Sequence, residues 1–207
     1  MNHRRLLLVA AVLVAAGCRT SQPPALGEHP IGALTSSTAA DALLALRAER
    51  AALGGARALL RVRVTSFRES GDEVQTFRAA VDVHGQHMEL TAFSPLGTTA
   101  MTIAADGDRV HVHDVLHGTD WDGTAADLSH AIGIFPAGVP PAEMAWLLLG
   151  YPGNAGIEVV ATPTGLASAT AGDLRVRYDP PVHPPQHAEV TSPKQKVEVT
   201  LTEIIGR

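Results

Sequence analysis

Histidine is the residue type whose spacing in this sequence most resembles a catalytic or metal-binding arrangement. His111 and His113 are two residues apart in a stretch that alternates with valine, and His117 follows closely. Residues two apart share one face of a strand, so three imidazoles could approach one another and bind zinc. No carboxylate or thiol stands beside them at a recognisable ligand spacing, and a His-x-His strand is commonly a solvated face. We expect no metal, and any role of these histidines is left open.

The sequence offers no nucleophile with a general base near it. Ser94 precedes a proline in a turn, and Asp120 and Asp122 flank Trp121 in a segment expected to be a surface loop. A Gly-x-Ser-x-Gly elbow, a phosphate-binding loop, a dinucleotide fingerprint and a metalloprotease helix motif are all absent from the sequence. We therefore expect no catalytic residues, no cofactor and no enzymatic activity.

Residues 1–17 predict a signal peptide. Arg4 and Arg5 form its positive start, and the apolar run from 6 to 16 is too short for a good membrane-spanning helix. The single cysteine, Cys18, follows at once. The segment 14–18 (Val-Ala-Ala-Gly-Cys) resembles the bacterial lipobox, which implies acyl chains such as palmitate on Cys18. Several acyl chains on one residue give stable membrane anchoring.

The charge of the chain after the signal peptide argues against nucleic acid as a partner. That part carries 14 Lys and Arg against 21 Asp and Glu, a formal charge of −7. A negative chain is not attracted to nucleic acid or to anionic lipid headgroups. The acylated cysteine, and not charge, must then hold the protein at a membrane.

The elements expected after the anchor are mostly strands. Residues 18–38 predict the lipidated cysteine with a flexible tether rich in Pro, Ser and Gly, and residues 39–207 predict one domain. Ser37 or Thr38 is a suitable N-cap for a helix to about residue 53, and further helices are expected at 125–132 and 142–149. Alternation and turn residues predict ten antiparallel strands, at 58–67, 74–83, 88–93, 98–104, 109–115, 157–161, 166–170, 174–178, 186–191 and 195–204.

The hairpin around Ser94-Pro95-Leu96-Gly97 carries a large apolar residue at its tip. Pro95 and Gly97 are turn formers, whereas Leu96 occupies a position that is usually polar. Two interpretations are open. Leu96 either folds back onto its own sheet or contacts something apolar outside the protein.

The order of these features resembles the LolB family of outer-membrane lipoprotein receptors. A lipobox, a tether and an N-terminal helix precede a strand–Ser-Pro-Leu-Gly-Thr-Thr–strand hairpin. The segment 140–153, Pro-Pro-Ala-Glu-Met-Ala-Trp-Leu-Leu-Leu-Gly-Tyr-Pro-Gly, follows at the matching distance, and strands 173–178 and 186–204 match the closing pair. The resemblance covers most of the chain after the signal peptide.

The resemblance implies a mainly β fold, an incomplete antiparallel β-barrel of about ten to eleven strands with helices covering the concave face. It implies a monomer at the periplasmic face of the outer membrane that accepts acylated lipoprotein cargo from a periplasmic LolA-like carrier. Pro95, Leu96 and Gly97 fall on the membrane-insertion loop of the family. Candidates for the acyl-binding interior are Leu90, Met101, Ile103, Trp146, Leu147 and Leu149.

Three alternatives to this interpretation are weighed with it. Each of the six interior candidates can equally be ordinary core. The protein as a whole can be a lipid-binding lipoprotein that does not transport, or a structural or assembly lipoprotein of the envelope whose cavity is filled.

Overall fold

The computed structural model describes residues 29–69, 71–127, 139–153 and 156–207. The expected signal peptide, Cys18 and the first part of the expected tether lie outside these residues. The second part of the tether segment lies against the domain: residues 29–30 pair with the last strand, and the Leu34 amide donates to the carbonyl of His183 at 3.3 Å.

One antiparallel sheet runs through the described part of the chain, in the order β7-β6-β5-β4-β3-β2-β12-β11-β10-β9-β8, with β1 pairing the end of β12. Its strands are β1 (His29–Pro30), β2 (Ala56–Ser66), β3 (Glu73–His84), β4 (His87–Phe93), β5 (Thr99–Asp106), β6 (Arg109–Asp114), β7 (Thr119–Thr124), β8 (Glu158–Thr162), β9 (Gly165–Ala171), β10 (Leu174–Tyr178), β11 (His187–Thr191) and β12 (Gln195–Gly206).

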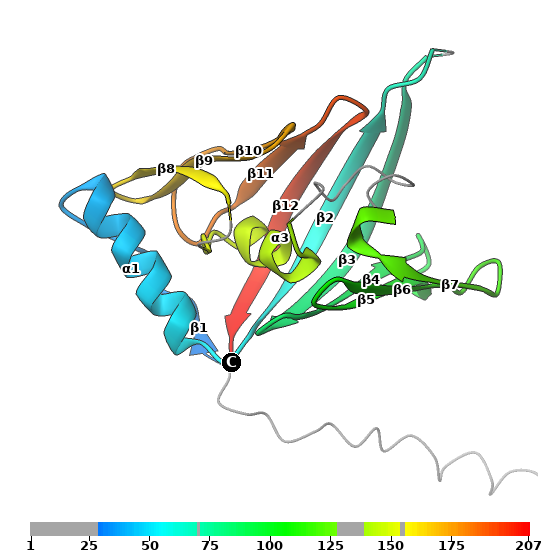
Figure 1. Cartoon of the computed structure of the whole chain (residues 1–207), viewed down its shortest axis with the longest axis horizontal. Coiled ribbons are helices and arrows are strands. Elements are labelled where there is room, and N and C mark those ends of the chain that lie inside the picture. Colours follow the sequence, from blue (N-terminus) through cyan, green and yellow to red (C-terminus); the bar gives the residue numbers. More distant parts are fainter. Residues whose placement is uncertain (1–28, 70, 128–138, 154–155) are drawn as a thin grey trace, which may run out of the picture.

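The sheet is open, because β7 and β8 each pair on one side only among the described strands. It bends about its central strands β2 and β12, so that β3–β7 form one wing and β8–β11 the other (Figure 1). The mainly β, incomplete barrel predicted from the sequence is thereby confirmed.

Alternating residues along the central strands define the two faces of the sheet. On β2, for example, Ala58, Leu60 and Val62 are buried, whereas Arg57, Arg61 and Arg63 between them are exposed. Side chains in a strand alternate faces, so the apolar set covers one surface of the sheet and the arginines the other. The apolar surface is the inner, concave one, and it is built mostly from Ala, Val and Leu.

Two helices lie on this inner side. Helix α1 (Ala39–Ala52) contacts β8 and β9, and α3 (Pro141–Leu148) lies between the wings in Figure 1 and contacts β3, β4 and β5. Thr38, one of the two expected N-caps, caps α1: its Oγ1 accepts a hydrogen bond from the Asp41 amide at 3.1 Å. Pro141 opens α3, where a missing amide proton is tolerated, and Gly150 follows its end at φ +87°.

All ten expected strands are present, and two were missed: the short β1, which falls in the expected tether, and β7. The prediction of a surface loop around Trp121 was wrong, because residues 119–124 pair with β6 along their whole length. Polar residues and a glycine hide this strand in the sequence, since an exposed edge needs no apolar alternation. The expected helix at 125–132 begins, with residues 125–127 helical, and its remainder lies outside the described residues.

Candidate functional site

The six candidate interior residues lie on the inner side of the sheet and in or directly after α3, and their burial is uneven. Ile103, Trp146, Leu147 and Leu149 are buried in the apolar core, and Leu90 and Met101 are half-buried beside it. The structure therefore brings them together as packed side chains. An acyl chain that enters here must take the place of contacts between α3 and the sheet.

Two hydrogen bonds attach α3 to opposite wings. The Trp146 Nε1–H donates to the carbonyl of Gly85, beyond β3, at 3.4 Å. The Tyr178 hydroxyl, on β10, donates to the carbonyl of Leu147 at 2.6 Å. Burial raises the pKa of Tyr178 above its ordinary value, so this hydroxyl keeps its proton. The helix thus bridges the two wings over the concave face.

A polar cluster joins α1 to α3 at the rim of this interior. The Arg50 guanidinium donates twice to the Glu143 carboxylate, with one Nη1–Oε2 distance of 2.9 Å, and lies 5.3 Å from the centre of the Trp146 ring. The Tyr151 hydroxyl donates to Glu49 Oε1 at 3.0 Å. Two-point arginine–carboxylate pairs define the orientation as well as the distance of their partners.

His183 lies behind this cluster in an unusual environment. It is 3% exposed, its ring centre is 4.8 Å from that of Tyr151, and both ring nitrogens lack a hydrogen-bond partner among the described residues. Glu49 Oε2 is 3.7 Å from Nε2, beyond hydrogen-bond distance. Burial lowers the pKa of His183 to about 4. Sequence reasoning missed this residue, because Tyr151 and Glu49, which lie against its ring, are 32 and 134 residues away.

The Ser94–Thr98 turn presents Leu96 to solvent. The Ser94 amide donates to the carbonyl of Thr98 at 2.8 Å, and the Gly97 amide donates to that of Ser94 at 2.9 Å. Gly97 has φ +82°, which only glycine adopts readily. Leu96 is 92% exposed at the tip. It does not fold back onto its own sheet.

The three histidines do not form one cluster. His111 and His113 share the outer face of β6, where their Nδ1 atoms lie 2.8 Å from Asp122 and 2.6 Å from Asp120 on β7. His117 is on the following turn and pairs with Asp114 at 2.7 Å. Within the described ranges, no group of three or more His, Cys, Asp or Glu has an arrangement suited to a metal ion.

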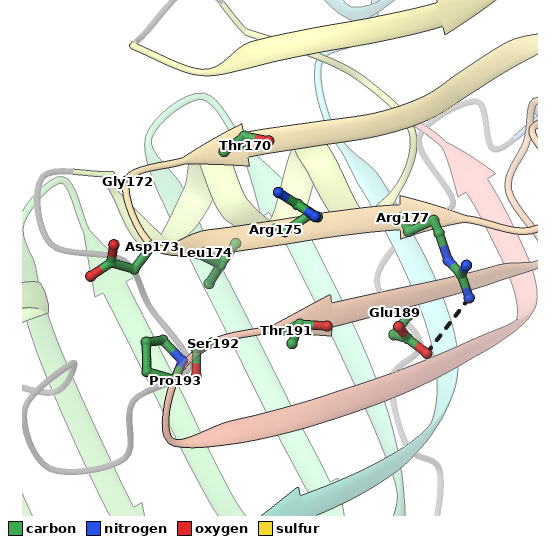
Figure 2. A pocket seen from close by; sticks show the side chains of 10 residues that line it. All are labelled: Thr170, Gly172, Asp173, Leu174, Arg175, Arg177, Glu189, Thr191, Ser192 and Pro193. Carbon is green, nitrogen blue, oxygen red and sulfur yellow. Dashed lines mark ion pairs between the residues drawn. The ribbon is translucent and has the colours of Figure 1, made fainter.

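Among the surface grooves that described residues line, two well-formed ones contain none of the six interior candidates. One, of about 610 Å³, lies over β9–β11, and Figure 2 shows its charged lining, with the Arg177–Glu189 ion pair (4.0 Å) across it. The other, of about 560 Å³, lies between β4 and β7 and includes Arg109 and His111. Neither groove is therefore the interior to which the six candidates were assigned.

A comparison with solved structures finds proteins with a similar fold. The LolA superfamily protein NE2245 from Nitrosomonas europaea matches with a TM-score of 0.52 at 10% identity, over 83% of this chain and 94% of its own. This chain has the LolA-type fold. At such identity the likeness extends to the fold alone.

Two other structures match less closely. An outer membrane lipoprotein-sorting protein domain from Vibrio parahaemolyticus (8% identity, 82% of this chain and 93% of its own) has a TM-score of 0.47. A conserved protein from Thermus thermophilus (10% identity, 80% and 85%) has a TM-score of 0.39. No protein-family model matches the sequence, and a sequence search of curated proteins gives no match.

The helices of this LolA-type chain are short. In the ranges that the structure describes, none is both long and apolar enough to cross a membrane.

Proposed function

We propose that this protein is a LolB-like receptor that is anchored to the periplasmic face of the outer membrane through acylated Cys18. It accepts acylated lipoproteins from a LolA-like periplasmic carrier and inserts them into that membrane without catalysis. The observation that carries the proposal is Leu96, a large apolar side chain that is 92% exposed at the tip of a hairpin on a LolA-type fold.

The interior suits acyl chains rather than polar substrates. Its walls come from the inner faces of both wings and from α3, and its members are almost all aliphatic or aromatic. Removal of apolar surface from water is favourable by about 25 cal/mol per Å², so a lipid chain can exchange between two such interiors without a nucleotide. Leu90 and Met101, half-buried beside the core, are the first of the six candidates that an entering chain would meet.

The turn that carries Leu96 suits contact with a membrane. Residues 90–105 contain no charged side chain, so the part of the β4–β5 hairpin between Glu89 and Asp106 can approach apolar material without burying a charge. Pro95 and Gly97 hold the turn in a shape that directs Leu96 outward. We assign these three residues to delivery of the cargo and the six interior residues to holding it.

A transfer assay tests this function. The carrier, loaded with a labelled lipoprotein, is mixed with the lipidated protein in vesicles, and both acceptance of the cargo and its later insertion are measured. Leu96→Glu should accept cargo yet fail to insert it. Leu44→Glu is the matched control, because Leu44 is a leucine on α1 with 65% exposure, and it should transfer normally.

The other outcomes separate the remaining functions. A protein that takes no cargo from the carrier but binds free acyl lipid is a lipid-binding lipoprotein that does not transport. One that binds neither has a structural or assembly role. Normal insertion by Leu96→Glu contradicts the role assigned to the turn.

A further inference from the structure

A second apolar turn lies beside the one that carries Leu96. Val115 and Leu116, on the turn between β6 and β7, are 43% and 66% exposed. The Val115 amide donates to the carbonyl of Ala100, at the start of β5, at 3.0 Å. Because Ala100 follows the Leu96 turn within four residues, the two turns are neighbours at one end of the sheet.

The charges on this second turn are already paired. Asp114 is its only acid, and its carboxylate accepts from the amides of Leu116 and His117 and lies 2.7 Å from His117 Nδ1. The hydrogen bond from His117 holds the pKa of Asp114 below its usual range. No Lys, Arg, Asp or Glu lies between Asp114 and Asp120 in sequence. The two leucines therefore project from neighbouring tips with little free charge between them.

The expected lipid anchor can reach the same membrane as these turns. Eleven residue steps separate Cys18 from His29, which span up to about 36–40 Å when fully extended. His29 pairs with Gly206 and Gly206 with Ala56, at the opposite end of the sheet from the turns. Phe93 is level with Arg61 through Arg78, about 17 Å along β2 from Ala56, and Leu96 lies three residues further on, which adds up to about 10 Å. The tether is thus long enough for the anchor and both turns to contact one bilayer.

We propose that Val115 and Leu116 form a second membrane contact, which inserts together with Leu96 into the bilayer that holds the anchor. This inference rests on the proposed function and extends it to the β6–β7 turn. A bilayer is the occupant that fits, because single side chains that project from convex tips need no complementary pocket in lipid. The formal charge of −7 after the signal peptide indicates a zwitterionic lipid surface.

Vesicle contact at the β6–β7 turn tests the inference directly. The chain from residue 18, with a hexahistidine tag in place of Cys18, is captured on phosphatidylcholine vesicles that contain a nickel-chelating lipid. Replacing the only cysteine also leaves a cysteine-free background. Thr119→Cys, an exposed site next to the turn, carries an environment-sensitive nitrobenzoxadiazole label, and Leu44→Cys on α1 carries the same label as the control.

The label at residue 119 should report an apolar environment on vesicles, and the label at residue 44 should not. Adding Leu116→Glu should lower the bilayer-contacting population about tenfold, because moving a leucine from water to an apolar phase is favourable by at least that factor. Leu96→Glu should lower it as well, since both tips contribute. Unfolding curves of the variants should match that of the parent, because both side chains are exposed.

No response from the residue 119 label, or an unchanged response in Leu116→Glu, overturns the second contact. The proposed function has its own measure, cargo transfer. One outcome is that Leu96→Glu abolishes cargo transfer, whereas Leu116→Glu changes neither cargo transfer nor the response of the residue 119 label. That outcome leaves the receptor function standing and refutes only the second membrane contact. A response of the residue 119 label without any cargo transfer refutes the receptor function and leaves the second membrane contact standing.

Discussion

Replacing His183 by phenylalanine should make the protein less sensitive to mild acid. In the folded protein, burial lowers the pKa of His183 to about 4, against an ordinary value of about 6.5 in an unfolded chain. Between these two values the unfolded state binds a proton that the folded state does not. The free energy of unfolding therefore falls as the pH is lowered through this window, and it is unaffected by His183 above about pH 7.

The two pKa values determine the size of the effect. Linkage gives a loss of about 2 kcal/mol between pH 7.5 and pH 5, growing to about 3 kcal/mol at pH 4. The nearest charged groups are on α1: the carboxylate of Glu49 lies 3.7 Å from His183 Nε2 and also accepts from Tyr151, and Arg50 pairs with Glu143. A proton on His183 would be partly stabilised by Glu49, so these figures are the largest that the geometry allows.

Urea unfolding at several pH values measures this contribution. Carboxylates elsewhere also titrate, so the quantity to compare is the difference between the wild type and His183→Phe at each pH. At pH 7.5 that difference reports packing against Tyr151 alone. By pH 5 it should have shifted by about 2 kcal/mol in favour of the variant. Parallel pH profiles for the two proteins, or an NMR titration of His183 with a midpoint near 6.5, would refute the reasoning.

Two further predictions concern the attachment of α3. Tyr178→Phe removes the 2.6 Å hydrogen bond to the carbonyl of Leu147 and should lower the free energy of unfolding by about 1–3 kcal/mol, measured in urea at neutral pH; a loss within error would mean that water replaces the hydroxyl. Gly150→Ala should destabilise by about 2 kcal/mol or more, because φ is +87° and a Cβ would lie 2.8 Å from Pro185 Cδ. Gly172→Ala is its control, with φ +58° in open space, and should show only the smaller backbone effect; equal losses would contradict the packing argument.

The sequence by itself determined the strands of this protein, because alternation is a local property. Strands such as β2, β10 and β12 bury one face, and residues two apart reveal that face without any knowledge of partners. The turns were equally local. Pro95 and Gly97 predicted the hairpin that presents Leu96, and Thr38 predicted the start of α1. Strand β7 escaped because an edge strand with polar residues carries no such alternation.

Tertiary structure alone decided which of the candidate side chains have partners and of what kind. Arg50 and Glu143 are 93 residues apart, and Glu49 and Tyr151 are 102 apart, so no local pattern announces their contact. His183, which no sequence pattern singled out, is buried, whereas His111, which looked like a possible ligand, lies beside an aspartate on the neighbouring strand. The same holds for Leu96 and Leu116. Their exposure, 92% and 66%, depends on what the folded sheet places beside each turn, which the residues of the turn alone do not specify.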